Sequence, residues 1–302
     1  MDRPYVLHIF TPGSRASPFD VNMAADAGWQ IIVPYPDVGL EEIEAMTQDT
    51  IFSRGLKGVA RTGVFIGGRD ALMADAMLDR ARRSMFKPFV VSLMADPSGA
   101  YTTAAAMVAR VDAALIDQHG GGLAGRSVVV LGGLGPVGRV AGVLAARLGA
   151  RVALSSRGGQ AAAEAGARQT GERFGVELHG ASGADAAALR ASIADAEVVL
   201  ACAAAGVQVL TADDLAGAKR LRVAADLNAV APAGIAGIGV MDDGAPLVGT
   251  RAIGIGALAV GNIKYQTQHR LLLQLRDSEK PQVLGLVEAF EMARSVVAEQ
   301  AA

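Results

Sequence analysis

The amino-acid sequence predicts an α/β protein with two domains: a central doubly wound domain, and an N-terminal α/β domain whose mostly parallel sheet is completed by C-terminal helices. Three observations lead to this prediction. Strand and helix patterns alternate over the first hundred residues, a strand, a glycine-rich turn and a helix follow in order at 127–150, and helical patterns return after 257. The 302 residues, of which 51% are hydrophobic and 19% charged, are sufficient for two hydrophobic cores.

The N-terminal domain is predicted from short apolar runs that are separated by helical patterns. Strands are expected at 5–10, 31–33, 63–67 and 89–94. Helices are expected at 17–28, 40–46 and 70–85, and an alanine-rich helix at 102–116 follows the last strand. Because strands that alternate with helices usually form a parallel sheet covered on both faces, these elements indicate an α/β layer.

The glycine-rich turn carries the most specific pattern of the central domain. Gly133, Gly135 and Gly138 form a GxGxxG motif between a buried strand and an amphipathic helix. In a dinucleotide-binding βαβ unit the first glycine makes a tight turn, the second lets the backbone approach a pyrophosphate, and the third lets helix and strand pack closely. Pro136 and Val137 fall in the first helical turn, where amide groups without a partner face the phosphates. The pattern therefore predicts a Rossmann dinucleotide-binding domain.

The boundaries of this domain follow from a linker and a change of pattern. The sequence HGGG at 119–122 is the clearest linker of the chain. We therefore expect the NAD(P)-binding Rossmann domain at 123–256, and the second domain at 1–118 together with 257–302. Further strands of the Rossmann domain are expected at 151–155, 197–201 and 222–226.

The residues after the second strand of a Rossmann domain distinguish NAD from NADP, because they contact the adenosine ribose. A carboxylate there binds the ribose hydroxyls of NAD, but this chain has Ser155, Ser156 and Arg157. Hydroxyl groups and a guanidinium group are suited to a phosphate, so NADP is the preferred cofactor and NAD the alternative. Ala203 and Asn228 follow two later strands and are expected on the nicotinamide side.

Composition excludes other classes of protein. A net charge of −2 with interspersed signs predicts no groove for nucleic acid, and the chain lacks the run of about 18 apolar residues that spans a membrane. The N-terminal apolar stretch is too short for a signal peptide, so we expect a cytoplasmic protein. Cys202 lies in an apolar run and is expected to be an inert, buried thiol. The histidines lack the spacing of metal ligands, so no metal site is expected.

Several stretches together resemble the methylene-tetrahydromethanopterin dehydrogenases of methylotrophic bacteria. They are SPFDVNMA at 17–24, QDTIFSR at 48–54, RTGVFIGG at 61–68, ADPSGAYTTAAAMV at 95–108, DLNAVAPAGIAGI at 226–238 and GIGALAVGNIKYQTQ at 254–268. The resemblance covers nearly the whole chain and is closest to the B form of the family. That form lacks the third glycine of the turn and often accepts NAD, whereas GLGPVG followed by SSRGG is more similar to the NADP-specific A form.

The resemblance implies an oxidoreductase of bacterial one-carbon metabolism. Its reaction would be the NAD(P)-dependent oxidation of methylene-tetrahydromethanopterin to the methenyl form, in formaldehyde oxidation. The resemblance also implies a homo-oligomer, either a trimer or a hexamer, and an N-terminal pterin domain that the C-terminal helices complete.

The resemblance further places Lys264 in the active site. A cation near the reacting carbon would oppose the positive charge that develops there, so we expect Lys264 to position the substrate and to transfer no proton. It would either donate a hydrogen bond to the pterin carbonyl or pair with an acidic group; the alternative is a surface lysine. Gln266, two residues later, offers a polar group to the pterin edge.

Asp20 is the candidate for stabilising the developing positive charge. It follows Phe19, a candidate contact to the substrate, at the opening of the first helix. The alternative for Asp20 is a carboxylate that complements the start of that helix. Thr102 and Thr103, at the start of a later helix, would either contact a ligand or cap the helix.

Other activities stay open at this stage. A methylene-tetrahydrofolate dehydrogenase would use the same chemistry, and the residues do not separate the two pterins. A dehydrogenase of hydroxy acids would need a general base and an arginine for the carboxylate, and no such pair stands out. A non-catalytic module that senses NADP through its oligomer would share the glycine turn.

Overall fold

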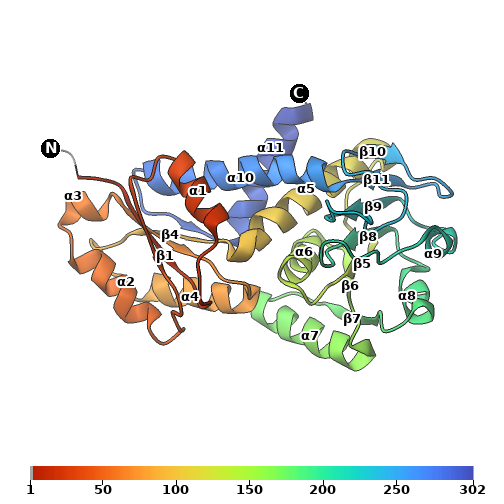
Figure 1. Ribbon diagram of the computed structural model, residues 1–302, viewed down its shortest axis with the longest axis horizontal. Helices are drawn as coiled ribbons and strands as arrows, with labels where there is room; N and C mark the ends of the chain where they lie inside the picture. The colour runs from red at the N-terminus through yellow and green to blue at the C-terminus, as the bar shows by residue number, and fades with distance from the viewer. Residues whose placement is uncertain (1–2, 302) are drawn as a thin grey trace. The chain divides into compact units, whose positions relative to one another are not determined.

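The computed structural model describes residues 3–301, and this part of the chain divides into two compact units (Figure 1). Unit 1 comprises Met1–Thr102 and Tyr265–Val296, and unit 2 comprises Thr103–Lys264 and Val297–Ala302. The boundaries fall inside three helices, α5 (Ala100–His119), α10 (Ala257–Asp277) and α11 (Leu286–Ala301). The first boundary, after Thr102, comes earlier in the chain than the glycine linker at 119–122. The second, after Lys264, comes later than the expected residue 257.

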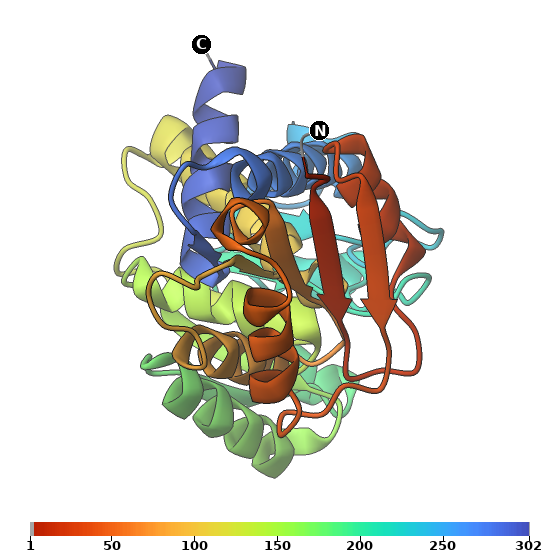
Figure 2. The same cartoon turned by 90° about the vertical axis from the view of Figure 1, so that its left-hand side faces the viewer.

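Unit 1 contains a parallel sheet of strands that come from both ends of the chain. The strands are β1 (Val6–Phe10), β2 (Ile31–Tyr35), β3 (Thr62–Ile66), β4 (Ser92–Ala95) and β12 (Val283–Leu284). Their order is β12-β4-β3-β1-β2, and each neighbouring pair is parallel. Figure 2 shows β1 and β2 as adjacent arrows that point the same way. The carboxyl ends of all these strands therefore lie at one edge of the sheet.

Helices cover both faces of this sheet. They are α1 (Pro18–Asp26), α2 (Ile43–Phe52), α3 (Leu56–Val59), α4 (Ala71–Arg83), the C-terminal part of α10, and α11 (Leu286–Ala301), with a short 3-10 turn, η1, at Pro97–Gly99. In Figure 1, α1 and α10 lie on one side of the strands, and α2 and α4 on the other. The Trp29 indole, directly after α1, donates a hydrogen bond to the Leu272 carbonyl (3.3 Å), which ties α10 to the N-terminal segment.

Two predicted elements of unit 1 are wrong in detail. The helical pattern expected after residue 257 is interrupted by a strand, because Val283 and Leu284 pair with Leu93 and Met94, and the last helix begins after Gly285. Strand pairing therefore decides the conformation of a segment too short to show a pattern of its own. The second helix runs over Ile43–Phe52, beyond the expected 40–46, because its apolar positions continue to Ile51, which is fully buried.

Unit 2 contains the predicted doubly wound sheet. Its strands are β5 (Ser127–Leu131), β6 (Arg151–Ser156), β7 (His179–Ser182), β8 (Val198–Ala201), β9 (Val223–Asp226), β10 (Asp243–Pro246) and β11 (Ile253–Ile255). They lie in the order β10-β11-β9-β8-β5-β6-β7, parallel except for β10. Running from β7 to β11, this is the Rossmann order, in which the direction of winding reverses between β5 and β8.

The helices of unit 2 enclose the sheet. They are α6 (Pro136–Arg147) and α7 (Gly159–Phe174) on one face, α8 (Ala186–Ile193) and α9 (Ala212–Ala216) on the other, and the C-terminal part of α5 (Figure 1). The strand expected before the glycine turn is confirmed as β5, and the predicted strands at 151–155, 197–201 and 222–226 are confirmed within a residue. Three further strands, β7, β10 and β11, were not predicted, because their sequences HGAS, DGAP and IGI lack a run of large apolar residues.

A buried charged group stabilises the amino ends of the central strands. Glu197, directly before β8, accepts hydrogen bonds from Arg126 (3.2 Å), Arg222 (3.3 Å) and the Ser127 amide (3.3 Å). Burial by itself would raise the pKa of Glu197, but these bonds and the charges of Arg126 and Arg220 outweigh it and hold the pKa below its ordinary value. The carboxylate thus links the starts of β5, β8 and β9.

Candidate active site

A cavity of about 770 Å³ opens in unit 2 at the carboxyl ends of β5, β6 and β8. Its lining includes the turn after β5, the residues that follow β6 and β8, and the start of α8. We call it the switch-point pocket, because it lies where the strand order reverses, the place at which open α/β sheets bind their ligands. The lining brings together five predicted cofactor residues: Gly135, Ser155, Ser156, Arg157 and Ala203.

The glycines of the turn have distinct structural roles. Gly132, which precedes the motif, has the left-handed φ of +68° that the tight turn requires, whereas this role was expected for Gly133. A Cβ atom at Gly133 would lie 2.8 Å from the Val130 carbonyl oxygen and from Leu154, so this glycine allows the turn to pack on β6. A Cβ at Gly138 would overlap the Gly132 carbonyl, which confirms its expected packing role.

Gly135 differs from these neighbours because little in the protein crowds it. A Cβ there would meet the Gly132 carbonyl oxygen at 3.3 Å and no other atom that close. Gly135 is the N-cap of α6, Pro136 is its first residue, and Val137 follows in the first turn, as predicted. The amides at this helix start have no acceptor inside the helix, so they suit an anionic ligand.

Arg139 holds the glycine turn in place, a role that sequence analysis missed. Its guanidinium group donates to the carbonyls of Leu134 (3.0 Å) and Gly166 (3.0 Å) and to the Thr170 hydroxyl. Leu134 lies in the turn, whereas Gly166 and Thr170 lie on α7, so Arg139 connects the turn to that helix. An Arg four residues after the second glycine of the motif was the signal available in the sequence.

The segment after β6 forms one end of the switch-point pocket. Ser155 is buried, its carbonyl accepts from the Gly133 amide (3.0 Å), and the Ser156 hydroxyl accepts from the Gly158 amide (3.1 Å). Arg157 is exposed, and among residues 3–301 no hydrogen bond or ion pair involves its guanidinium group. Asp185, which the analysis did not name, lines the same pocket and caps α8 by accepting from the Ala188 amide (2.8 Å).

The residues after β8 and β9 have different roles. Ala203 lines the switch-point pocket, whereas Asn228 is not among the lining residues. The Asn228 side chain accepts from the amides of Gly206 and Val230 (both 3.0 Å) and donates to the Pro232 carbonyl (2.7 Å), so it orders the loop after β9. Burial, with the nearby charge of Asp226, raises the pKa of the Cys202 thiol to about 12, which makes this thiol unreactive.

In unit 1, the carboxylate of Asp20 is buried and joined to α10. Its Oδ1 accepts a hydrogen bond from the Gln268 side-chain amide (3.1 Å), and Gln268 has no exposed surface. Lys264 is four residues before Gln268 on the same helix and is the last residue of unit 2 before the boundary in α10. Phe19, next to Asp20, is 47% exposed. Gln268 belongs to the QTQ stretch at 266–268, and no role was predicted for it from the sequence.

The remaining predicted substrate residues differ in exposure. Thr102 is fully buried; its hydroxyl donates to Asp96 (2.7 Å), and its amide donates to the same carboxylate (3.2 Å). This is the helix-start role that the sequence analysis gave as the alternative. Thr103 is half-buried on α5, and half-buried Gln266 accepts from Arg270 (3.4 Å). Their contact with substrate stays a prediction.

The described residues fit a dinucleotide better than other ligands. The switch-point pocket combines a glycine whose missing side chain leaves room, a helix start for phosphates and hydroxyls after β6 for a ribose. Within residues 3–301, no group of His, Cys, Asp or Glu side chains is arranged to hold a metal ion. None of the helices in the described range is long and apolar enough to cross a membrane.

This fold and this pocket define a dinucleotide-binding protein of the Rossmann class, with a second α/β unit beside it in the chain. The family model described as methylene-tetrahydromethanopterin dehydrogenase, N-terminal, matches residues 18–98. The chain is 45% identical over 288 residues to the NAD(P)-dependent methylenetetrahydromethanopterin dehydrogenase of Methylorubrum extorquens, covering 95% of this chain and 97% of that protein. It therefore belongs to the methylenetetrahydromethanopterin dehydrogenase family.

A second relative and a solved structure are also similar to this chain. The chain is 33% identical over 291 residues to the bifunctional protein MdtA of the same organism, covering 96% of this chain and 98% of that protein. Quinate dehydrogenase from Corynebacterium glutamicum, solved in complex with NAD, has a similar fold. Its TM-score is 0.51 at 13% identity, with 98% of this chain and 99% of that chain covered. That likeness concerns the fold, which is the predicted one.

Proposed function

We propose that this protein oxidises methylene-tetrahydromethanopterin to the methenyl form, with NAD(P)⁺ as hydride acceptor. The observation that carries the proposal is the 45% identity, over 95% of the chain, to an enzyme of that name. The switch-point pocket supplies the nucleotide site that the reaction needs. In this proposal unit 2 binds the nucleotide, and unit 1, which contains the matched residues 18–98, binds the pterin.

The chemistry requires alignment more than acid–base catalysis. The hydride leaves a methylene carbon between two nitrogens, and the lone pairs of these nitrogens stabilise the resulting cation. No proton has to be removed from the substrate. The protein can therefore accelerate the reaction by fixing the substrate, excluding water and placing negative charge near the developing cation.

Asp20 and Lys264 have complementary roles in this proposal. The buried Asp20 carboxylate provides the negative charge, and Gln268 holds its Oδ1 at 3.1 Å. A fixed, partly desolvated carboxylate stabilises a nearby cation more than one in water does. Lys264 orients the substrate through a hydrogen bond or an ion pair and takes no part in proton transfer.

The nucleotide, when bound, supplies the hydride-accepting ring. Gly135, Pro136 and Val137 would hold its pyrophosphate at the start of α6, while Ser155 and Ser156 would contact the adenosine ribose. We propose that Arg157 gives NADP the advantage over NAD, because its exposed guanidinium group can bind a 2′-phosphate with two charge-assisted hydrogen bonds.

We also propose that the protein acts as a cytoplasmic homo-oligomer, a trimer or a hexamer. Support comes from the resemblance of the motifs to the family, whose members function as oligomers. Size-exclusion chromatography with light scattering would measure the mass in solution, and cell fractionation would locate the protein. A monomer with full activity would contradict the oligomer.

A spectrophotometric assay tests the reaction itself. Purified protein is given methylene-tetrahydromethanopterin or methylene-tetrahydrofolate, each with NADP⁺ and with NAD⁺, and nucleotide reduction is followed. We expect turnover with the methanopterin substrate and a lower KM for NADP⁺. Faster turnover of the folate would assign the alternative activity, and nucleotide binding without turnover would indicate a sensing module.

The role of Lys264 needs a separate test. Lys264→Ala should raise the pterin KM and lower kcat through misalignment, while the KM for the nucleotide stays close to that of the wild type. Lys280→Ala, in the loop before β12, serves as a matched control without effect on either constant. Restoration of kcat by an added external amine would instead assign proton transfer to Lys264.

A further inference from the structure

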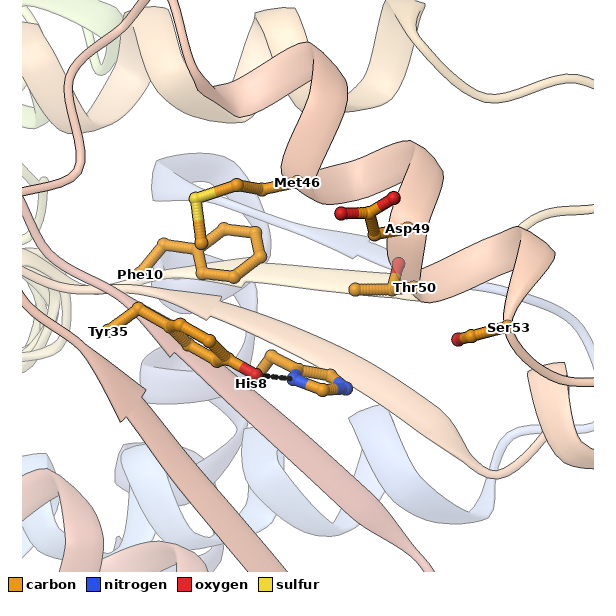
Figure 3. A pocket seen from close by; sticks show the side chains of 7 residues that line it. All are labelled: His8, Phe10, Tyr35, Met46, Asp49, Thr50 and Ser53. Atoms are coloured by element: carbon orange, nitrogen blue, oxygen red, sulfur yellow. Dashed lines mark hydrogen bonds between the residues drawn. The ribbon is translucent and has the colours of Figure 1, made fainter.

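A second cavity, of about 220 Å³, lies in unit 1 between α2 and the strands β1 and β2 (Figure 3). We call it the aromatic pocket. One wall consists of His8, Phe10 and Tyr35, and the other of side chains from α2. Neither the proposed hydride transfer nor the nucleotide uses these residues.

The aromatic wall is ordered by contacts among its own rings. The centroids of Phe10 and Tyr35 are 5.6 Å apart, those of His8 and Tyr35 5.7 Å apart, and Tyr35 Oη is hydrogen-bonded to His8 Nδ1 (3.2 Å). Burial, and then the charge of Arg54, lowers the pKa of His8, so the imidazole is neutral near pH 7. The wall therefore offers uncharged rings to a planar ligand.

The opposite wall carries a carboxylate. Met46, Asp49 and Ser53 recur at helical spacing and line the pocket from α2. In Figure 3 the Asp49 side chain projects from the helix on the pocket side. Among residues 3–301 no hydrogen bond or ion pair involves the Asp49 carboxylate, whereas the nearby Thr50 hydroxyl is bonded to the Thr47 carbonyl (2.6 Å). Asp49 thus has acceptor capacity for a ligand.

We propose that the aromatic pocket binds the pterin ring of the substrate, with Asp49 accepting hydrogen bonds from its 2-amino group and the neighbouring ring N–H. This inference rests on the proposed function. A carboxylate opposite aromatic rings suits a flat heterocycle with two adjacent N–H donors, because the rings stack while both oxygens accept. The volume of about 220 Å³ holds such a ring but no dinucleotide.

The aromatic pocket extends toward the carboxyl edge of the sheet, which suits a substrate whose reactive end faces that edge. Phe10 and Tyr35 end β1 and β2 at the carboxyl edge of the sheet, and Met46 lies in the first turn of α2. Asp49 and Ser53 lie one and two helical turns further along. A pterin anchored by Asp49 would therefore direct its reactive end toward the carboxyl edge, where parallel sheets place their chemistry. The QDTIFSR stretch at 48–54 thereby receives a function.

The first test is kinetic. Asp49→Asn keeps the shape but replaces one acceptor by a donor, so we expect the pterin KM to rise about tenfold or more, with unchanged nucleotide KM and Tm. Glu44→Gln is the matched control, because it removes one negative charge from the same helix, where Glu44 pairs with Arg80 on α4 (2.9 Å). Equal pterin KM values for the two variants would overturn the proposal.

The second test uses fragments and does not depend on turnover. Fluorescence titration compares pterin with lumazine, in which a carbonyl replaces the 2-amino group. Wild type should bind pterin about tenfold more tightly, and Asp49→Asn should lose that preference. Guanosine carries the same donor edge, and tighter binding of guanosine than of pterin would assign the pocket to a purine. Equal binding of pterin and lumazine would contradict the Asp49 contact, even if the wild type oxidises the full substrate. If the fragments bind as expected but the full substrate is not oxidised, the proposed reaction is contradicted instead.

Discussion

The switch-point pocket of unit 2 and the aromatic pocket of unit 1 are built in different ways. The first includes the backbone of the glycine turn, together with residues that follow β6 and β8 and the start of α8. The second is built from side chains of β1, β2 and α2, which come from three separate segments. The glycine turn of the first pocket is local, so its spacing can be read in one stretch of sequence. A side-chain site exists after the sheet has formed.

The difference also affects how each site tolerates substitution. At the glycine turn an added Cβ atom changes either packing or ligand access, depending on which glycine receives it. In the aromatic pocket an isosteric change at Asp49 alters chemistry and leaves packing intact. Variants that separate binding from stability are therefore the most informative tests of the comparison.

The largest effect is expected at Gly135. Gly135→Val places methyl groups where a pyrophosphate would approach, so the Kd for NADP⁺ should rise by about a hundredfold or more, as measured by calorimetry. The Tm should fall less than in Gly138→Ala, because the added Cβ meets only the Gly132 carbonyl oxygen, at 3.3 Å. Gly138→Ala is the control with the opposite pattern: its Cβ overlaps the Gly132 carbonyl, so stability should fall by about 2 kcal/mol. An unchanged Kd for folded Gly135→Val would remove the pyrophosphate from this turn.

A smaller effect, limited to one cofactor, is expected at Arg157. Arg157→Asp should lower kcat/KM for NADP⁺ relative to NAD⁺ by about thirtyfold, because a carboxylate repels the 2′-phosphate and can bind ribose hydroxyls. Arg168→Asp on the same unit provides the charge-matched control. The interpretation of the SSRGG segment fails if wild type already prefers NAD⁺ tenfold.

Arg139 is expected to act on the nucleotide through the glycine turn. Arg139→Ala removes the bonds to Leu134 and Gly166 and should raise the NADP⁺ KM by about tenfold, with the pterin KM unchanged. Arg147→Ala on the same helix is the matched control, since Arg147 bonds to Phe174 at the other end of α7 (3.2 Å). Similar nucleotide KM values for both variants would limit Arg139 to a structural role.

The smallest effect on binding is expected at Glu197. Glu197→Gln leaves Arg126 and Arg222 without their carboxylate and should destabilise the fold by about 3 kcal/mol at pH 7, with both KM values unchanged. Since the folded-state pKa of Glu197 is lowered, its contribution is fully present above about pH 4.3 and is lost as pH falls through the folded-state pKa. Chemical denaturation at several pH values should therefore show the two proteins converging in acid. A constant difference between them would contradict the assigned pKa direction.

Much of the fold could be predicted because its signals are local. The apolar runs of β5 and β8 and the helical spacing of α6 identified unit 2. The residues after β6 were correctly placed in the switch-point pocket, because carboxyl ends of parallel strands meet at one edge. The loop contacts of Asn228 could not be predicted, because a polar side chain after a strand serves a loop as readily as a ligand.

The sequence by itself determined the doubly wound unit, the glycine turn and the family, since each depends on residues close together in the chain or on motifs in a fixed order. The tertiary structure decided the rest. Pairing with β4 made a strand of Val283 and Leu284, Gln268 reached Asp20 from 248 positions away, and the aromatic pocket joined β1 and β2 to α2. These contacts form between segments whose own sequences do not encode the partner, because the free energy that selects them comes from burial and hydrogen bonding in the folded chain.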